Sequence, residues 1–237
     1  MNEILDGIVK AFELIISGNP AVYSVTLRSL LISGAATLIA VSWGTPIAMV
    51  LGLRDFKGKF FVKGVFNTLM GIPTVALGLV LFLFFERESG IVGFLNLLYT
   101  PTAIIIGEAI LITPIIVSFA TTAIEAVDPQ IVNLAKTLGA TESRASLTVL
   151  REATAGILLA STACFNRAIA ELGVALMVGG NIEGVTDVLT TVISRETQRY
   201  NISIAIALSI VLLLVVFGIT VAVNLFHRRR KWTSSQS

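Results

Sequence analysis

The chain has 237 residues, of which 55% are hydrophobic and 14% are charged, and its mean hydropathy is +0.89. A soluble globular domain of this length is far less apolar, so the composition indicates a polytopic membrane protein. The net charge of +2 is too small to suggest a nucleic-acid partner. One cysteine, Cys164, and one histidine, His227, exclude an internal disulfide framework and argue against a cysteine or histidine metal site.

Residues 1–18 are predicted to form an amphipathic helix that lies in the membrane interface, outside the cell. Four apolar residues share one helical face, while acidic and basic residues interrupt the stretch, which is also too short to cross a bilayer. The apolar residues are Ile4, Ile8, Phe12 and Ile15. The segment has neither the basic start nor the small-residue cleavage site of a signal peptide.

Five later segments are apolar over about 20 residues or more, the length that a membrane-spanning helix needs. They are 24–53, 62–85, 101–127, 154–178 and 202–226. Basic residues follow the first, third and fifth segments, and Lys and Arg are retained on the cytoplasmic side. We therefore expect an all-α bundle of five spans in the plasma or inner membrane over 24–226, with the N-terminus outside and 227–237 as a basic cytoplasmic tail.

Small residues recur at every fourth position of the first span, which predicts close packing against a neighbouring helix. These residues are Ala36, Ala40, Gly44, Ala48 and Gly52. Pro46, Pro73 and Pro114 each interrupt one of the first three spans, where a proline can bend a helix that lines a gated pathway. Membrane helices also tolerate proline without any such role.

Four ionisable residues are expected at membrane depth: Arg28, Glu108, Arg167 and Glu171. A charge there costs several kcal/mol unless it is paired or hydrated, so each is a candidate pathway residue. Arg167 and Glu171 are four residues apart and can pair along one helix face, with Asn166 beside them. Structural pairing between helices explains the same residues, and both interpretations stay open.

The connection between the last two spans begins where Gly179 and Gly180 break the fourth helix. A short amphipathic stretch, about 186–197, then returns toward the membrane. Such a loop can close the outer mouth of a pathway, receive an external partner, or serve as a passive connection. Gly179, Gly180 and Pro73 complete the candidate gate residues.

A polar, helix-forming insert at 128–150 lies between two of these spans. Asp128 can cap a helix that starts at Pro129, and Gly139 tolerates the left-handed turn that ends it. Thr141 can then start a second short helix that runs to Leu150. We expect a helix–glycine–helix elbow at the cytoplasmic face of the membrane, where a soluble partner can bind it and move it. Coupling of the partner's energy to transport is therefore the leading hypothesis.

The elbow resembles the cytoplasmic loop of the integral membrane subunits of ABC importers. That loop reads Glu-Ala-Ala, three residues, Gly, and nine residues later a hydrophobic position near a Pro. Ala135, Gly139 and Val149 keep this spacing, whereas Asn133 and Leu134 replace the first two positions. Arg151 and Glu152 stand where Leu-Pro is usual.

The chain from Tyr23 onward is similar to the tungstate-type oxyanion permeases of this class. The likeness is carried by the segments 23–28, 71–75, 170–173 and 177–182. It implies the type I importer fold, a homodimer, a cytoplasmic ATPase subunit on each elbow, and an external binding protein that delivers tungstate or a similar oxyanion. Molybdate, sulfate and phosphate fit the residues equally well. The residues expected to form the ATPase-docking surface are Leu134, Ala135, Leu138, Gly139, Ala140 and Thr141.

The chain has no phosphate-binding loop, since the nearest imitation, Gly52 to Phe60, has the wrong spacing and no hydroxyl. ATP and Mg²⁺ are therefore expected in the partner subunit, and we expect no catalytic, cofactor or metal site here. Two other functions stay open. An ion-gradient transporter would use Glu108, Arg167 and Glu171 directly, although internal repeats are not evident. A membrane scaffold or sensor would use the elbow for docking alone.

Overall fold

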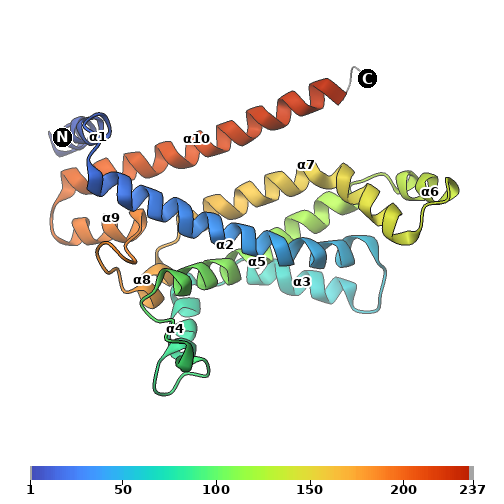
Figure 1. Cartoon of the computed structure of the whole chain (residues 1–237), viewed down its shortest axis with the longest axis horizontal. Coiled ribbons are helices and arrows are strands. Elements are labelled where there is room, and N and C mark those ends of the chain that lie inside the picture. Colours follow the sequence, from blue (N-terminus) through green and yellow to red (C-terminus); the bar gives the residue numbers. More distant parts are fainter. Residues whose placement is uncertain (1, 235–237) are drawn as a thin grey trace. The chain divides into compact units, whose positions relative to one another are not determined.

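The computed structural model describes the backbone of residues 2–234 and the side chains of residues 4–225. Every regular element in this range is helical, as the sequence predicts (Figure 1). The basic residues predicted for the tail, together with His227, lie beyond the described side chains. The helices are α1 (Asn2–Ile16), α2 (Pro20–Leu53), α3 (Lys59–Leu69), α4 (Thr74–Phe85), the 3₁₀ turn η1 (Gly93–Leu95), α5 (Pro101–Glu125), α6 (Pro129–Thr137), α7 (Glu142–Ile169), α8 (Gly173–Gly179), α9 (Leu189–Gln198) and α10 (Ile202–Ser234).

Four helices are long and apolar enough to cross a membrane: α2, α5, α7 and α10 over Ile202–Leu225. Helices α3 and α4 meet the same criterion only as a pair, which makes up to five spans in the described chain. Residues 62–85 therefore do not form a single helix, and the bend that Pro73 allows is present, because α3 and α4 meet at an angle of 97°. Gly71 and Pro73 end the helix there, because proline has no N–H and disfavours helical geometry in the residue before it.

The predicted boundaries around the fourth span are also wrong. The second helix of the elbow is the first part of α7, which continues from Glu142 to Ile169 without interruption. The chain then breaks at residues 170–172, inside the predicted span 154–178, and resumes as the short helix α8. The predicted break at Gly179 and Gly180 is confirmed, because α8 ends at Gly179 and Gly180 is left-handed.

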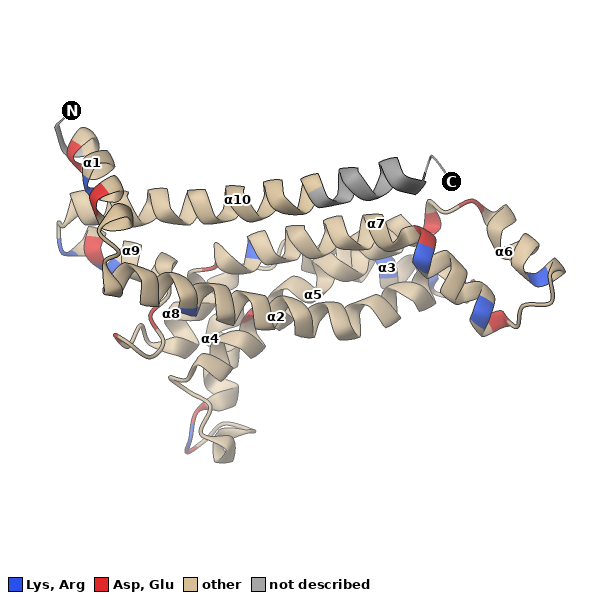
Figure 2. Ribbon diagram, turned by 45° about the horizontal axis from the view of Figure 1, so that its top comes forward, with Lys and Arg blue, Asp and Glu red and all other residues tan. Residues whose placement is uncertain are grey.

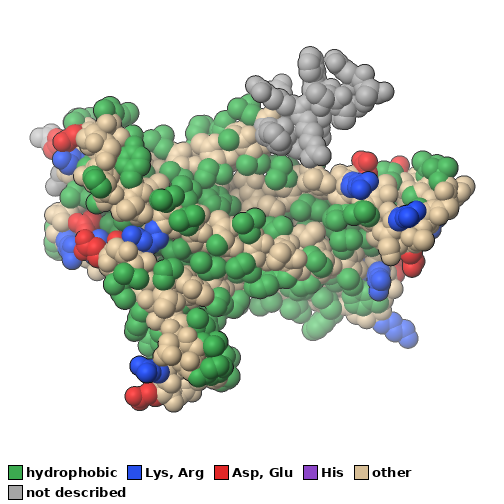
Figure 3. All heavy atoms as spheres, viewed as in Figure 1, with side chains coloured by type: hydrophobic (Ala, Val, Ile, Leu, Met, Phe, Trp, Pro, Cys, Tyr) green, Lys and Arg blue, Asp and Glu red, His purple; other side chains and the backbone are tan. Residues whose placement is uncertain are grey.

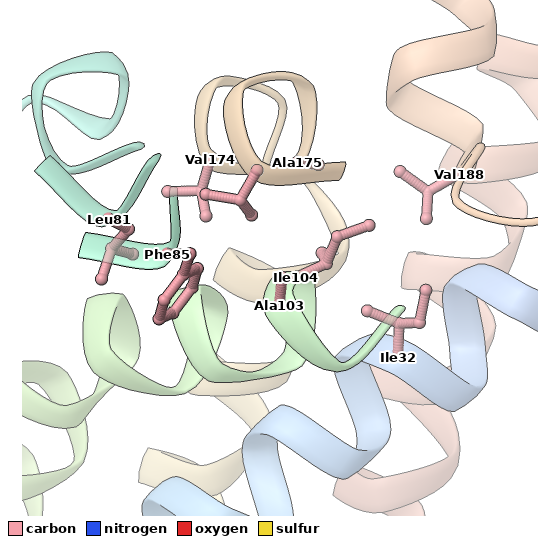
Figure 4. Close-up of a cluster of buried hydrophobic side chains, with 9 residues drawn as sticks. Ile32, Leu81, Phe85, Ala103, Ile104, Val174, Ala175 and Val188 are labelled. Carbon is pink, nitrogen blue, oxygen red and sulfur yellow. The ribbon is translucent and has the colours of Figure 1, made fainter. Parts of the chain in front are cut away.

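The chain folds as two compact units, each assembled from separate stretches of sequence. The first unit comprises 1–36, 73–108 and 168–237, and the second comprises 37–72 and 109–167. A hydrophobic cluster at the centre of the first unit joins α4, α5 and α8 through Leu81, Phe85, Ile104 and Val174 (Figure 4). Packing there is close, because a Cβ added at Gly107 would lie 2.5 Å from Val174.

In the first unit, α1 packs against α10 and turns three distinct faces to its surroundings (Figure 1). Its small residues face α10: a Cβ at Gly7 would lie 2.6 Å from Ile206, and Ala11 is buried. Its charged face holds the Lys10–Glu13 pair. Its third face exposes large apolar side chains, namely Leu5, Val9, Phe12 and Ile16.

In the second unit, the small-residue stripe of α2 packs closely against α5, as predicted. A Cβ added at Gly44 would lie 2.4 Å from Ile116, and one added at Gly52 would lie 2.6 Å from Ile124. The Trp43 indole N–H also donates to the Thr113 hydroxyl at 2.7 Å, with its acceptor on α5. Pro46 and Pro114 lie within continuous helices, unlike Pro73.

Candidate functional site

The elbow begins with the helix start that the sequence predicts. The Asp128 carboxylate accepts a hydrogen bond of 2.8 Å from the Gln130 backbone N–H, and Pro129 occupies the first turn of α6. Asp before the helix and Pro in its first turn both suit a helix N-terminus, because the first N–H groups have no partner within the helix. Interactions between neighbouring residues therefore determine where α6 begins.

The elbow turns through a Schellman motif centred on Gly139, whose φ is +83°. The Ala140 N–H donates to the Ala135 carbonyl and the Gly139 N–H donates to the Lys136 carbonyl, both at 3.0 Å. This pattern satisfies the last carbonyls of α6 and needs a residue that tolerates positive φ. Thr141 then accepts the first bond of α7, because the Ala145 N–H donates to its carbonyl at 2.9 Å.

Two apolar side chains are exposed among the polar residues of the elbow. Leu134 is 62% exposed and Leu138 is 79% exposed, so two leucines at the end of α6 have little cover within the chain. The coloured ribbon of Figure 2 shows residues of both charges around this segment and few along the long helices between their ends, and Figure 3 shows charged side chains on the surface there. Exposed leucines framed by charges are typical of a protein-docking surface.

A cluster of four charged residues lies at the end of α5, just before the elbow. The Glu125 carboxylate contacts the ammonium groups of Lys59 at 3.3 Å and Lys63 at 2.6 Å, both on α3. Lys59 also contacts Asp55 at 3.3 Å. From the sequence, these lysines indicate only which side of the membrane is cytoplasmic. No local pattern pairs them with Glu125, which is 62 residues from Lys63. The cluster ties α3 to the end of α5.

Arg28 is a clamp on the connection that follows α8. Its guanidinium forms an ion pair with Asp187, whose side chain is 3% exposed, and donates to the Gly184 carbonyl at 2.9 Å. Asp187 in turn accepts from the Gly184 N–H at 3.1 Å. These contacts favour the structural interpretation of Arg28, which we had also considered as a pathway residue. The sequence gives no signal for this pair, because Asp187 lies 159 residues after Arg28.

Glu171 stabilises the break between α7 and α8. Its carboxylate accepts from the Val174 N–H at 3.1 Å, at the start of α8, and its carbonyl accepts from the Thr190 hydroxyl at 2.7 Å. The predicted continuous helix face for Arg167 and Glu171 does not exist, since α7 ends at Ile169.

The other polar candidates differ in burial. Glu171 is 2% exposed and Glu108, on α5, is 1% exposed. Asn166 and Arg167, in the last turn of α7, are half-buried. Buried carboxyl groups at membrane depth fit a functional site and an internal ion pair alike.

The glycines around α8 are required by close contacts in the first unit. A Cβ at Gly173 would lie 2.6 Å from the Thr74 hydroxyl, directly after Pro73 at the cap of α4. A Cβ at Gly179 would lie 2.6 Å from Ile104. Gly180 has φ +68° and faces Tyr99 at the same separation. Of the candidate gate residues, Gly179 and Gly180 thus allow close packing at the end of α8, and Pro73 stands at the start of α4.

A second charged cluster lies at the end of α9. Glu196 accepts from the Asn201 side-chain amide at 2.8 Å, and Arg195 and Arg199 lie 3.4 and 3.5 Å from its other oxygen. The hydrogen bond from Asn201 and the two positive charges hold the pKa of Glu196 below its ordinary value, against a partial burial that raises it. Among the described residues, no three His, Cys, Asp or Glu side chains gather to hold a metal ion.

Comparison with known proteins identifies the family of this chain. The profile of the binding-protein-dependent transport system inner membrane component family matches residues 44–232, more than half of the chain. The chain belongs to this family. A permease of this kind is an integral membrane subunit of an ABC importer, which confirms the resemblance drawn from the elbow and the multi-pass membrane location.

Two relatives and one solved structure show how far the likeness extends. The tungstate uptake system permease protein TupB of Peptoclostridium acidaminophilum is 35% identical over 223 residues, covering 94% of this chain and 97% of the relative. A probable anion ABC transporter permease protein of Haloferax volcanii is 41% identical over 201 residues, covering 83% and 86%. A chain of the inward-facing MetNI methionine ABC transporter matches with a TM-score of 0.72 at 17% identity, covering 89% of this chain and 94% of that one. The permease therefore has the type I importer fold.

Removing the Arg28 clamp should destabilise the permease. Arg28→Ala leaves the Asp187 carboxylate buried without its cation, which costs about 3 kcal/mol for a pair of this kind. The midpoint of thermal unfolding in detergent should fall markedly, and the double variant Arg28→Ala/Asp187→Ala should recover part of the loss. Equal and additive losses for the two single variants would contradict the pairing.

The cluster around Glu196 should make stability depend on acid pH. Because the pKa of Glu196 is lower in the folded chain than in the unfolded chain, its contribution is complete above the unfolded value of about 4.3 and disappears as the pH falls through the folded value. The unfolding midpoint of the native permease should therefore fall more steeply below about pH 4.3 than that of Glu196→Gln. Parallel pH profiles would rule out this contribution.

Proposed function

We propose that this permease is the membrane subunit of an ATP-driven importer for a tetrahedral oxyanion, with tungstate as its first candidate. The observation that carries the proposal is the elbow itself, in which a capped helix, a Schellman turn at Gly139 and two exposed leucines form a built docking surface. A chain without its own phosphate-binding loop needs an external source of work, and this surface is where a motor subunit fits.

The proposed assembly contains two copies of this chain, two cytoplasmic ATPase subunits that hold ATP and Mg²⁺, and an external binding protein. The elbow and the C-terminus are cytoplasmic, and the N-terminus is outside. ATP-driven closure of the ATPase subunits moves each elbow through Leu134, Leu138 and the turn at Gly139. This motion switches a pathway at the interface of the two copies between inward-facing and outward-facing states. The relatives with tungstate and anion transport in their names support this assignment.

The substrate assignment stands on those relatives rather than on any residue of this chain. Molybdate, sulfate and phosphate share the tetrahedral geometry and negative charge of tungstate. An external binding protein also performs part of the selection, so a permease sequence reports substrate indirectly. Among the candidate pathway residues, Glu108, Asn166, Arg167 and Glu171 supply both signs of charge and indicate no preference by themselves.

Gly139→Val should uncouple the motor from the permease. A Cβ at Gly139 has open space around it, since nothing lies within 4 Å, so the cost arises from positive φ alone. A β-branched residue pays about 1–2 kcal/mol or more there, enough to lower import into proteoliposomes by about tenfold. Gly139→Asn is the matched control, because asparagine tolerates the left-handed region, and it should keep most of the import. Normal import by Gly139→Val would contradict the coupling role of this turn.

Import itself tests the wider proposal. Vesicles that contain the permease, its ATPase subunit and its binding protein should accumulate tungstate only when ATP is supplied on the ATPase side. Unlabelled molybdate, sulfate and phosphate are added as competitors, and the strongest competition identifies the carried oxyanion. An ATPase subunit that fails to co-purify, or import driven by an ion gradient without ATP, would refute the ATP-driven mechanism. A scaffold would show no uptake under either condition.

A further inference from the structure

The second unit contains a cavity of about 390 Å³ beside the elbow, separate from the exposed leucines. Three helices supply its walls: the end of α2, α6 and the first turns of α7. The lining residues are Met49, Val50, Leu53, Arg54, Val132, Lys136, Glu142, Ser143, Ala145 and Ser146. Nothing in the coupling mechanism described above uses this cavity.

The cavity carries a positive charge that the chain leaves largely uncompensated. Within the part of the chain that the structure describes, the Arg54 guanidinium takes no hydrogen bond or ion-pair partner. Lys136 contacts Glu142 at 3.9 Å, the outer limit of an ion pair, and the Glu142 side chain is 87% exposed. An exposed pair at that separation is weak and screened by water. Two cations, one directly after α2 and one on α6, therefore line the cavity together with one weakly paired carboxylate.

The remaining walls fit an anion with oxygen atoms. The Ser143 and Ser146 hydroxyls can donate from the first turns of α7. A guanidinium offers two parallel N–H donors to one oxyanion, whereas a lysine ammonium supplies a compact point charge. Met49, Val50 and Leu53 form an apolar wall directly before Arg54, at the end of a membrane-crossing helix. Basic pockets in that position are suited to the head groups of anionic lipids.

We propose that this cavity binds a phosphate-type anion, which joins Arg54 at the end of α2 to Lys136 on α6. The bound anion stabilises the elbow against the end of the first span and so modulates its response to the motor. This role in coupling rests on the proposed function, whereas the binding itself does not. The anion comes either from an anionic phospholipid, with its glycerol portion along the apolar wall, or from a free oxyanion in the cytoplasm.

Binding is tested on the purified complex of permease and ATPase, with Arg54→Gln and Lys136→Gln as cavity variants. Arg151→Gln is the matched control, because Arg151 is an exposed residue of α7 outside the cavity lining. In one arm, equilibrium dialysis measures radiolabelled inorganic phosphate with no lipid added. In the other, native mass spectrometry counts phosphatidylglycerol adducts against phosphatidylcholine adducts. Circular dichroism confirms that each variant is folded.

We expect saturable binding in at least one arm by the native complex and by Arg151→Gln, and about tenfold weaker binding by Arg54→Gln and Lys136→Gln. Phosphate binding alone assigns the free anion, and retention of phosphatidylglycerol alone assigns the lipid. No binding in either arm, or an equal loss in Arg151→Gln, overturns the site. Failure of the ATPase to co-purify counts against the proposed function instead, because the same binding assays then run on the permease alone.

Discussion

The absence of water in a bilayer core is the constraint on which the rest of this structure depends. Every backbone N–H and C=O at that depth needs a partner from the protein, so an interrupted helix has to supply substitutes for its lost bonds. Burial inside the protein imposes the same demand on the stretch after α8, where the Thr186 hydroxyl, itself fully buried, donates to the Gly179 carbonyl at 2.6 Å and accepts from the Ile182 N–H at 2.9 Å. Ser29 accepts from the Leu189 N–H at 2.8 Å. The ion pair of Arg28 with Asp187 is another side-chain interaction that stabilises this irregular stretch.

The same constraint explains why the two kinds of candidate residue look so different. At the elbow, where water is available, polar groups are exposed and the ordered features are local ones, a cap and a turn. Around α4 and α8, carboxyl groups are buried and glycines allow backbones to approach closely. A permease needs an exposed surface where it binds a soluble partner, and it needs complete hydrogen bonding where it crosses the membrane. The polar residues of this chain accordingly divide between exposed positions at the elbow and buried, hydrogen-bonded positions in the first unit.

Sequence reasoning succeeded where structure follows from local chemistry. Asp128, Pro129 and Gly139 are specified by capping rules, and the stripe around Gly44 follows from close helix packing. It failed at both ends of the predicted fourth span, for different reasons. Arg151, Glu152 and Ala153 are good helix formers with no stop signal, so α7 continues through a stretch where polarity suggested a boundary. The break at 170–172 carries no glycine or proline before Gly173, and depends on contacts such as the Thr190 hydroxyl that no local pattern reveals.

The uninterrupted course of α7 has a mechanical consequence. Its 28 residues, Glu142–Ile169, extend for roughly 42 Å at about 1.5 Å per residue. Because its backbone helix is unbroken over that length and contains no proline, α7 has no built-in site for a sharp kink. Compliance is then confined to its two ends, at Gly139 and at the short gap before α8. The backbone can change direction more readily at these two ends, one at a left-handed glycine and the other beside the buried carboxylate of Glu171.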